Sequence, residues 1–166
     1  MSGFTKLVKV GNVNSEVDRP KVVPAPVFFF VALISGILLN WALPLAIFSG
    51  RTAQLAGAII VIPGFLIGCS GIIEMRRAHT SPDPREPTRA LVEKGVFRYT
   101  RNPLYLSMFV FFLGIAVFLD VFWLILLFPF LFFVVERGTV KPEELYLERK
   151  FGETYLQYRK RVSRWI

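Results

Sequence analysis

The feature that most limits how this chain can fold is an apolar run from Pro103 to Val135 with a charge in its middle. The run is 33 residues long, and Asp120 is its only charged residue. A helix of about 20 apolar residues crosses a bilayer core, so the run exceeds one ordinary span. A carboxylate at the bilayer centre is also costly. We therefore expect Asp120 at a hairpin tip between helices over 103–119 and 121–136; one long tilted helix is the alternative.

Two earlier apolar blocks, over 27–48 and 53–73, bring the expected number of spans to four. Of the whole chain, 54% is hydrophobic, which is more than a soluble domain usually carries. We therefore expect an all-α integral membrane fold: four transmembrane helices plus a cytoplasmic loop and a C-terminal interfacial helix. Residues 1–26 are polar and lack a signal-peptide pattern, so we expect an uncleaved N-terminal polar or interfacial segment before a membrane domain over 27–166.

The second block also contains repeated small residues, which predict close packing between helices. Glycines stand at positions 57, 64, 68 and 71. Small residues allow helix backbones to approach closely in lipid. Pro63 lies in the same block, and it is expected to bend the helix unless neighbouring groups satisfy the freed carbonyl.

The positive charge is unevenly distributed, and this predicts the topology. Residues 1–26 carry four Lys or Arg, residues 74–101 carry seven and residues 137–166 carry eight, whereas the two short turns carry only Arg51. With four spans, all three basic segments lie on one side, and the positive-inside bias makes that side cytoplasmic. We expect a multi-pass protein of a prokaryotic inner membrane with both termini cytoplasmic. The expected partner is the lipid bilayer and not nucleic acid; the sequence does not indicate an oligomeric state.

The polar loop over 76–102 is long for so small a membrane protein, and loops of this length are usually functional. Prolines in its first half exclude a helix there. The loop ends at Asn102-Pro103, where proline suits the first helical position and asparagine suits the N-cap. With Arg98 and Arg101 one turn before it, this helix N-terminus would suit an anionic group such as a carboxylate or phosphate. An ordinary turn with flanking charges is the alternative.

The tail predicts a basic, aromatic helix over 142–161 that lies at the membrane surface. Pro142 followed by Glu143 and Glu144 is typical of a helix start. One glutamate could turn into a cytoplasmic pocket and bind hydroxyls or a cation; a solvated helix start is the alternative. Trp165 and Ile166 could anchor in the headgroups. The side chains expected on one helical face are Glu144, Glu148, Phe151, Tyr155 and Tyr158.

Two ordered blocks of residues resemble the isoprenylcysteine carboxyl methyltransferases and their phospholipid N-methyltransferase relatives. The first block comprises residues 80–82, 91–98 and 100–106. The second comprises Glu143-Glu144, residues 151–155 and Tyr158-Arg159. The resemblance covers about half of the chain, and it departs from the isoprenylcysteine enzymes at two positions. Those enzymes carry a histidine at the position of Asn102, as many bacterial relatives also do, and an arginine at the position of Thr139.

The resemblance implies an enzyme that uses S-adenosylmethionine to methylate a lipid-like or hydrophobic small acceptor at the cytoplasmic face. It does not indicate whether oxygen, nitrogen or sulfur is methylated. The catalytic candidates are Glu143, Glu144 and Arg137, although Arg137 is out of register with the family's arginine. Which of the two glutamates faces the cofactor stays open. The cofactor-binding candidates are Arg89, Ala90, Leu91, Val92, Phe97, Tyr99, Arg101, Asn102, Pro103, Leu104, Tyr105 and Glu143.

Two other function classes fit the sequence. A membrane sterol- or steroid-type reductase would use the arginines to hold the 2′-phosphate of NADPH. A non-enzymatic membrane scaffold would use its basic face to bind anionic lipid. The chain has one cysteine and one histidine, so neither a disulfide nor a cysteine–histidine metal set is expected.

Overall fold

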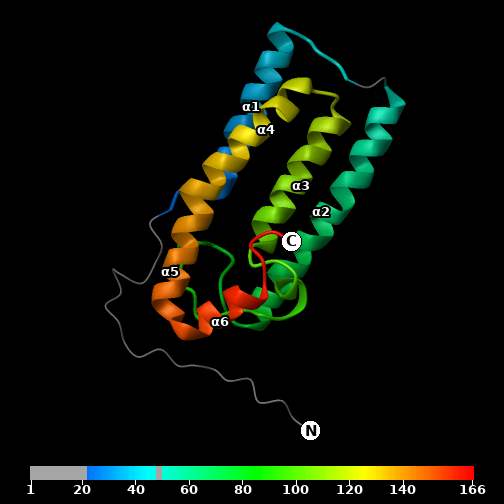
Figure 1. Cartoon of the computed structure of the whole chain (residues 1–166). Coiled ribbons are helices and arrows are strands. Elements are labelled where there is room, and N and C mark those ends of the chain that lie inside the picture. Colours follow the sequence, from blue (N-terminus) through cyan, green and yellow to red (C-terminus); the bar gives the residue numbers. More distant parts are fainter. Residues whose placement is uncertain (1–21, 48–49) are drawn as a thin grey trace.

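The computed structural model describes residues 22–47 and 50–166, which form helices and loops without a strand (Figure 1). Residues 1–21 of the expected N-terminal segment lie outside this part. Three helical stretches are long and apolar enough to cross a membrane, namely Ala25–Ala42, Arg51–Arg77 and Phe122–Phe151. The apolar helix Pro103–Phe118 is shorter, at 16 residues. The elements are α1 (Ala25–Ala42), α2 (Arg51–Arg77), η1 (Gly95–Arg98), α3 (Pro103–Phe118), α4 (Phe122–Val135), η2 (Glu136–Val140), α5 (Lys141–Phe151) and α6 (Glu153–Arg161).

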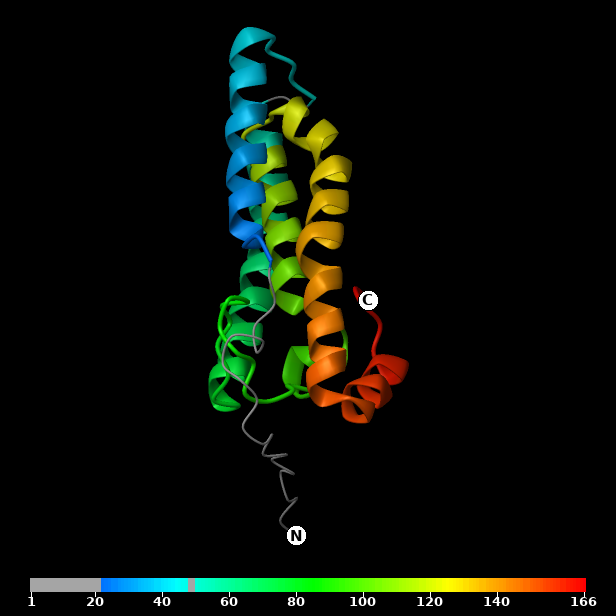
Figure 2. The same ribbon diagram turned by 90° about the vertical axis from the view of Figure 1, so that its left-hand side faces the viewer.

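The four apolar helices form two neighbouring pairs. α2 packs along α3, α1 packs along α4, and α3 also contacts α4. The polar elements gather at one end of this bundle: the loop after α2, η1, α5 and α6 all lie there, as Figures 1 and 2 show. The start of α1 points to the same end, so segments far apart in the sequence meet below the bundle.

The packing of α2 on α3 confirms the role expected of the glycines. A Cβ atom added at Gly57 would lie 2.4 Å from the backbone nitrogen of Phe118. From the opposite helix, a Cβ added at Gly114 would lie 2.6 Å from Cγ2 of Val61. The two backbones therefore approach as closely as glycine permits. α2 also continues through Pro63 without interruption.

The hairpin expected at Asp120 is confirmed, and the single long helix is excluded. α3 ends at Phe118, α4 begins at Phe122, and Asp120 has a positive φ of 52°. Aspartate tolerates this left-handed backbone better than most residues. Its Oδ1 accepts a hydrogen bond of 2.9 Å from the backbone N–H of Ile47. The carboxylate thus ties the hairpin tip to the loop that follows α1.

Two helices have bounds that differ from the expected spans. The first helix, α1, begins at Ala25 and ends at Ala42, so it does not reach residue 48, since the residue before Pro44 is biased away from helical geometry. The second helix, α2, contains the expected span over 53–73 and continues to Arg77. Its last turn is polar but still helical, and Arg77 pairs with Glu74 at 2.8 Å. Hydropathy marks where a helix leaves lipid, whereas the helix itself ends further on.

The expected helix start at Pro142 is also wrong, because α4 continues through η2 into α5. η2 is a π-helical turn in which the N–H of Lys141 donates to the carbonyl of Glu136, five residues back. This wider turn precedes Pro142 and accommodates a residue that lacks an N–H. Glu143 and Glu144 therefore lie inside a long helix and not at a solvated N-terminus.

The single helix expected over 142–161 is divided at Gly152. Gly152 has a φ of 52°, a left-handed conformation that suits glycine, and it ends α5 and caps α6. Tyr155 and Tyr158 therefore do not continue the helical face of Glu144. Instead the break turns α6 back below the bundle, so that both tyrosines are buried.

An aromatic core fills the space between α1, α3 and α4. Phe109 is its centre, with ring centroids of Phe29, Phe132 and Trp165 within 5.0–5.5 Å. Trp165 was expected in the headgroups but packs in this core, whereas Ile166 is exposed. On the outer faces of α1 and α2, large apolar side chains are exposed, including Phe30, Trp41, Ile59 and Phe65. Such faces suit contact with lipid.

Candidate functional site

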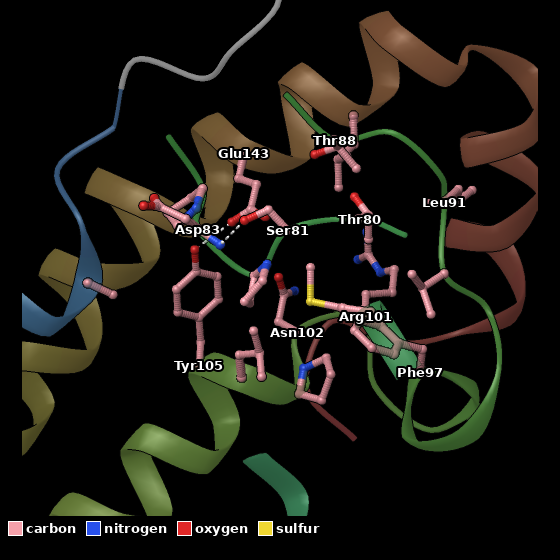
Figure 3. A pocket seen from close by; sticks show the side chains of 18 of the residues that line it. Thr80, Ser81, Asp83, Thr88, Leu91, Phe97, Arg101, Asn102, Tyr105 and Glu143 are labelled. Carbon is pink, nitrogen blue, oxygen red and sulfur yellow. Dashed lines mark hydrogen bonds between the residues drawn. The ribbon is translucent and has the colours of Figure 1, made fainter. Parts of the chain in front are cut away.

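A cavity of about 390 Å³ lies at the polar end of the bundle, below the N-terminus of α3. Its wall is formed by the start of α1, the end of α2, the loop over 78–102, the first turns of α3, and α5 with α6. Figure 3 shows the side chains that converge on it. The two stretches in which the sequence places the functional residues therefore form one hollow.

Ten of the twelve cofactor-binding candidates line this cavity. Arg89 and Tyr99 do not. The backbone N–H of Arg89 donates to Oγ1 of Thr80 at 3.0 Å, but its side chain is exposed. Tyr99 is 75% exposed, and Arg98 is also exposed. The candidates that line the cavity are Ala90, Leu91, Val92, Phe97, Arg101, Asn102, Pro103, Leu104, Tyr105 and Glu143.

The three catalytic candidates are separated by the structure. Glu143 lines the cavity, where the hydroxyl of Tyr105 donates to its Oε2 at 2.5 Å (Figure 3). Glu144 is buried behind the cavity wall. Arg137 is exposed, and its guanidinium carbon lies 4.9 Å from the ring centroid of Phe133. Because η2 and α5 form a continuous helix, neighbouring side chains there point in different directions, and only Glu143 points into the hollow.

The buried carboxylate of Glu144 is surrounded by donors. Its Oε1 accepts hydrogen bonds from Nδ2 of Asn102 at 3.2 Å and from the guanidinium of Arg164, and it pairs with Nη1 of Arg101 at 3.1 Å. Asn102 therefore does not cap α3 with its side chain, as its position suggested. Its amide connects the start of α3 to α5 instead.

Arg101 is the buried cation of the cavity wall. Its side chain is 8% exposed, and Nη1 also donates to the hydroxyl of Tyr155 at 3.2 Å. Within the part of the chain that the structure describes, Nε of Arg101 is the one buried side-chain nitrogen or oxygen without a hydrogen-bond partner. A buried guanidinium with an unused donor fits a site for an anionic ligand group.

The proline-containing segment Thr80–Thr88, part of the loop expected over 76–102, forms one wall of the cavity, although none of its residues was among the predicted site residues. The N–H of Thr88 donates to the hydroxyl of Tyr146 at 3.2 Å, which fastens the segment to α5. Asp83 and Arg85 form a salt bridge of 2.7 Å, and this guanidinium lowers the pKa of the Asp83 carboxyl. The prolines of the Thr80–Thr88 segment were visible in the sequence, but no periodic pattern predicted the direction in which the segment folds.

Two tyrosines of α6 also line the cavity without having been predicted to do so. The hydroxyl of Tyr158 donates to the carbonyl of Phe97 at 2.8 Å, which attaches α6 to η1. Burial raises the pKa of Tyr155 to about 12, so its hydroxyl is a neutral partner for Arg101 at physiological pH. Only a fold-back at Gly152 brings these residues to the site.

A second cavity, also of about 390 Å³, lies between α1, α2 and α3. Its walls are almost entirely apolar and include Phe29, Gly64 and Cys69. Pro26 and Met108 line both cavities, so the apolar groove adjoins the polar hollow. A ligand with an apolar part and a polar end could occupy both.

The fold and these two cavities define a helical membrane protein with a polar site at one end of its bundle and an apolar groove beside it. Residues 52–154, more than half of the chain, match the sequence model of the phospholipid methyltransferase family. The chain belongs to this family. It is also 34% identical over 89 residues to protein-S-isoprenylcysteine O-methyltransferase of Schizosaccharomyces pombe.

That match covers 54% of this chain and 38% of the yeast protein, so the chain spans well under half the length of this relative. The resemblance predicted from the two residue blocks is confirmed. Members of these two groups are membrane methyltransferases that use S-adenosylmethionine.

Proposed function

We propose that this protein transfers a methyl group from S-adenosylmethionine to a lipid-like or hydrophobic small acceptor at the cytoplasmic membrane face. The observation that carries the proposal is the junction of the two cavities at Pro26 and Met108. It offers a polar site for a charged donor directly beside an apolar site for the acceptor. The family membership supports methyl transfer over the reductase and scaffold alternatives.

We propose further that all four apolar helices cross the membrane. As a helix, the 16 residues of α3 are about 24 Å long, somewhat less than a bilayer core of about 30 Å. α3 lies between α2 and α4, which shield much of it from lipid. The basic segments at the polar end favour a cytoplasmic position for that end and for both termini.

The residues around the polar cavity match the groups of the proposed cofactor. Its carboxylate would be held by Arg101 and by the first backbone N–H groups of α3. Its amino group or ribose hydroxyls would be held by Glu143, which Tyr105 orients. Leu91, Val92 and Phe97 would form the apolar wall around the remainder. When bound, the cofactor supplies a sulfonium methyl group.

The protein's contribution to such a transfer is mainly alignment. Displacement at a methyl carbon requires the acceptor atom in line behind it, and holding two reactants in this geometry removes much of the barrier. The apolar groove would hold the body of the acceptor, so that its polar end reaches the other cavity past Met108. Neither Arg137 nor Glu144 lines the cavity. We therefore assign the direct contact to Glu143.

Binding of S-adenosylhomocysteine to the purified protein tests the proposal. We expect calorimetric titration to give a measurable Kd, and we expect Glu143→Ala and Asn102→Ala each to raise it at least tenfold. Tyr99→Phe serves as the control, because Tyr99 is largely exposed outside the cavity. Undiminished binding in both variants would contradict the site assignment. If the protein bound NADPH and did not bind S-adenosylhomocysteine, the result would favour the reductase alternative.

A further inference from the structure

The last residues of the chain fold back over the Asn102-Pro103 corner. The N–H of Arg101 donates to the carbonyl of Ser163 at 3.0 Å. Oγ1 of Thr100 and Nδ2 of Asn102 both donate to the carbonyl of Arg164, at 2.9 and 3.3 Å. The backbone around Arg164 therefore satisfies three donors immediately before α3 begins.

The side chain of Arg164 crosses to the long helix formed by α4, η2 and α5. Its Nη2 donates to Oε2 of Glu144 at 2.7 Å, and Nε lies 3.1 and 3.2 Å from the two oxygens of the same carboxylate. Its Nη1 donates to Oε1 of Glu136 at 2.8 Å. One guanidinium thus holds two carboxylates, that of Glu136 at the start of the π-helical turn and that of Glu144 in α5.

The charge balance around Glu144 links Arg164 to the cavity. Three cations, Arg101, Arg164 and Lys141, face only two carboxylates here, because Glu136 pairs with both Arg164 and Lys141 while Glu144 pairs with Arg101 and Arg164. Arg164 takes Oε2 of the Glu144 carboxylate as well as part of Oε1, whereas Arg101 has a single contact with Oε1. As a result, the charge of Arg101 is only partly compensated within the protein, and its Nε has no partner.

We propose that Arg164 is a positioning residue for the cofactor corner. It anchors Glu144 through its side chain and Asn102 through its carbonyl, and it thereby leaves the charge of Arg101 directed at the cavity. Without it, Arg101 would be the sole cation paired with a buried carboxylate, and its guanidinium would be drawn to Glu144. This inference rests on the proposed function, because it concerns how an anionic ligand group is held.

A variant in the same tail provides a matched control. Arg161 lies three positions earlier and forms a salt bridge of 2.6 Å with Glu93, but its side chain is 66% exposed. Exposed ion pairs contribute little. Arg161→Gln therefore removes the same charge from the same segment without touching the Glu144 cluster.

The test is calorimetric titration of the full chain with S-adenosylhomocysteine. We expect Arg164→Gln to raise the Kd at least tenfold, Arg164→Lys to raise it less, and Arg161→Gln to change it by less than twofold. In a protein that already carries Glu144→Gln, adding Arg164→Gln should raise the Kd less than threefold further, because Arg164 affects Arg101 through Glu144. A general loss of stability would instead produce independent, multiplying effects.

The outcomes separate the two proposals. If the unmodified protein does not bind S-adenosylhomocysteine, the proposed function is wrong, whatever Arg164 does. If it binds and Arg164→Gln changes the Kd no more than Arg161→Gln does, the positioning role is wrong. Should Arg164→Gln fail to fold, Arg164→Lys decides: a Kd raised at least threefold supports the role, and an unchanged Kd overturns it.

Discussion

The hydroxyl of Tyr105, in the first turn of α3, donates to Oε2 of Glu143 in α5 with the two oxygens 2.5 Å apart. The two residues are 38 positions apart in sequence and belong to the two ends of the apolar hairpin. The bond therefore closes the polar end of the hairpin and orients a carboxylate toward the cavity.

Removal of this hydroxyl should weaken both the ligand site and the fold. Tyr105→Phe leaves Glu143 without its donor, and we expect the free energy of unfolding to fall by about 1–3 kcal/mol. The Kd for S-adenosylhomocysteine should rise severalfold. Thermal unfolding and titration measure the two effects, with the exposed Tyr99→Phe as control. Equal affinities for the two variants would show that Glu143 needs no orientation by Tyr105.

The contact between α2 and α3 should not tolerate even a methyl group at Gly57. A Cβ there would lie 2.4–2.5 Å from three atoms of Phe118, two of them backbone atoms. Such overpacking costs about 1–3 kcal/mol or more, so Gly57→Ala should lower the unfolding temperature by several degrees. At Gly138 the nearest atom to an added Cβ is 3.6 Å away, in the ring of Phe28. Gly138→Ala should therefore leave that temperature almost unchanged; comparable losses would argue against the close packing.

Filling the apolar groove should impair acceptor use without affecting the cofactor. Cys69 lines the groove and not the polar cavity. We expect Cys69→Phe to reduce the transfer of labelled methyl groups into extractable membrane lipid at least fivefold, while the Kd for S-adenosylhomocysteine changes less than twofold. Ile59→Phe is the control, because Ile59 belongs to the same helix but is 70% exposed and does not line the groove. Full transfer by Cys69→Phe would place the acceptor elsewhere.

The Asp83–Arg85 salt bridge gives the proline-containing wall a defined pH dependence. Because Arg85 lowers the pKa of Asp83 below its ordinary value of 3.8, the carboxylate stays ionised throughout the neutral range. The stabilisation is therefore present above that value and is lost as pH falls through the lowered pKa. Arg85→Gln should return the pKa of Asp83 toward 3.8. Carboxyl-carbon NMR of labelled aspartate, assigned with Asp83→Asn, measures this; an identical titration in both proteins would contradict it.

The sequence predicted those parts of the fold that follow from placing apolar, charged and small residues in or outside a lipid bilayer. The charge of Asp120 located the hairpin tip, because a carboxylate avoids the bilayer centre. The glycines of α2 indicated a packing face, because small residues have few other uses in lipid. The Asn102-Pro103 corner and Glu143 were correctly placed on one hollow, although the evidence for their joining was the spacing of a family motif and not any periodicity.

The remaining features depend on backbone geometry that hydropathy does not encode. A proline followed by two acids is compatible with a new helix and also with a π-helical turn, as found before Pro142. Whether Glu143 or Glu144 faces the cavity is decided by this turn. Similarly, glycine is common enough that the left-handed break at Gly152 could not be located, and the burial of Tyr155 follows from it.

The shared boundary of the two cavities at Pro26 and Met108 has a consequence for how the proposed reaction would be supplied. A water-soluble donor could arrive and leave through the polar end, while a membrane-dissolved acceptor moved sideways in its leaflet. Neither reactant would have to be extracted into the other's solvent. Turnover would then be governed by the acceptor's concentration in the bilayer plane, and dilution of the membrane with inert lipid would slow it at constant protein.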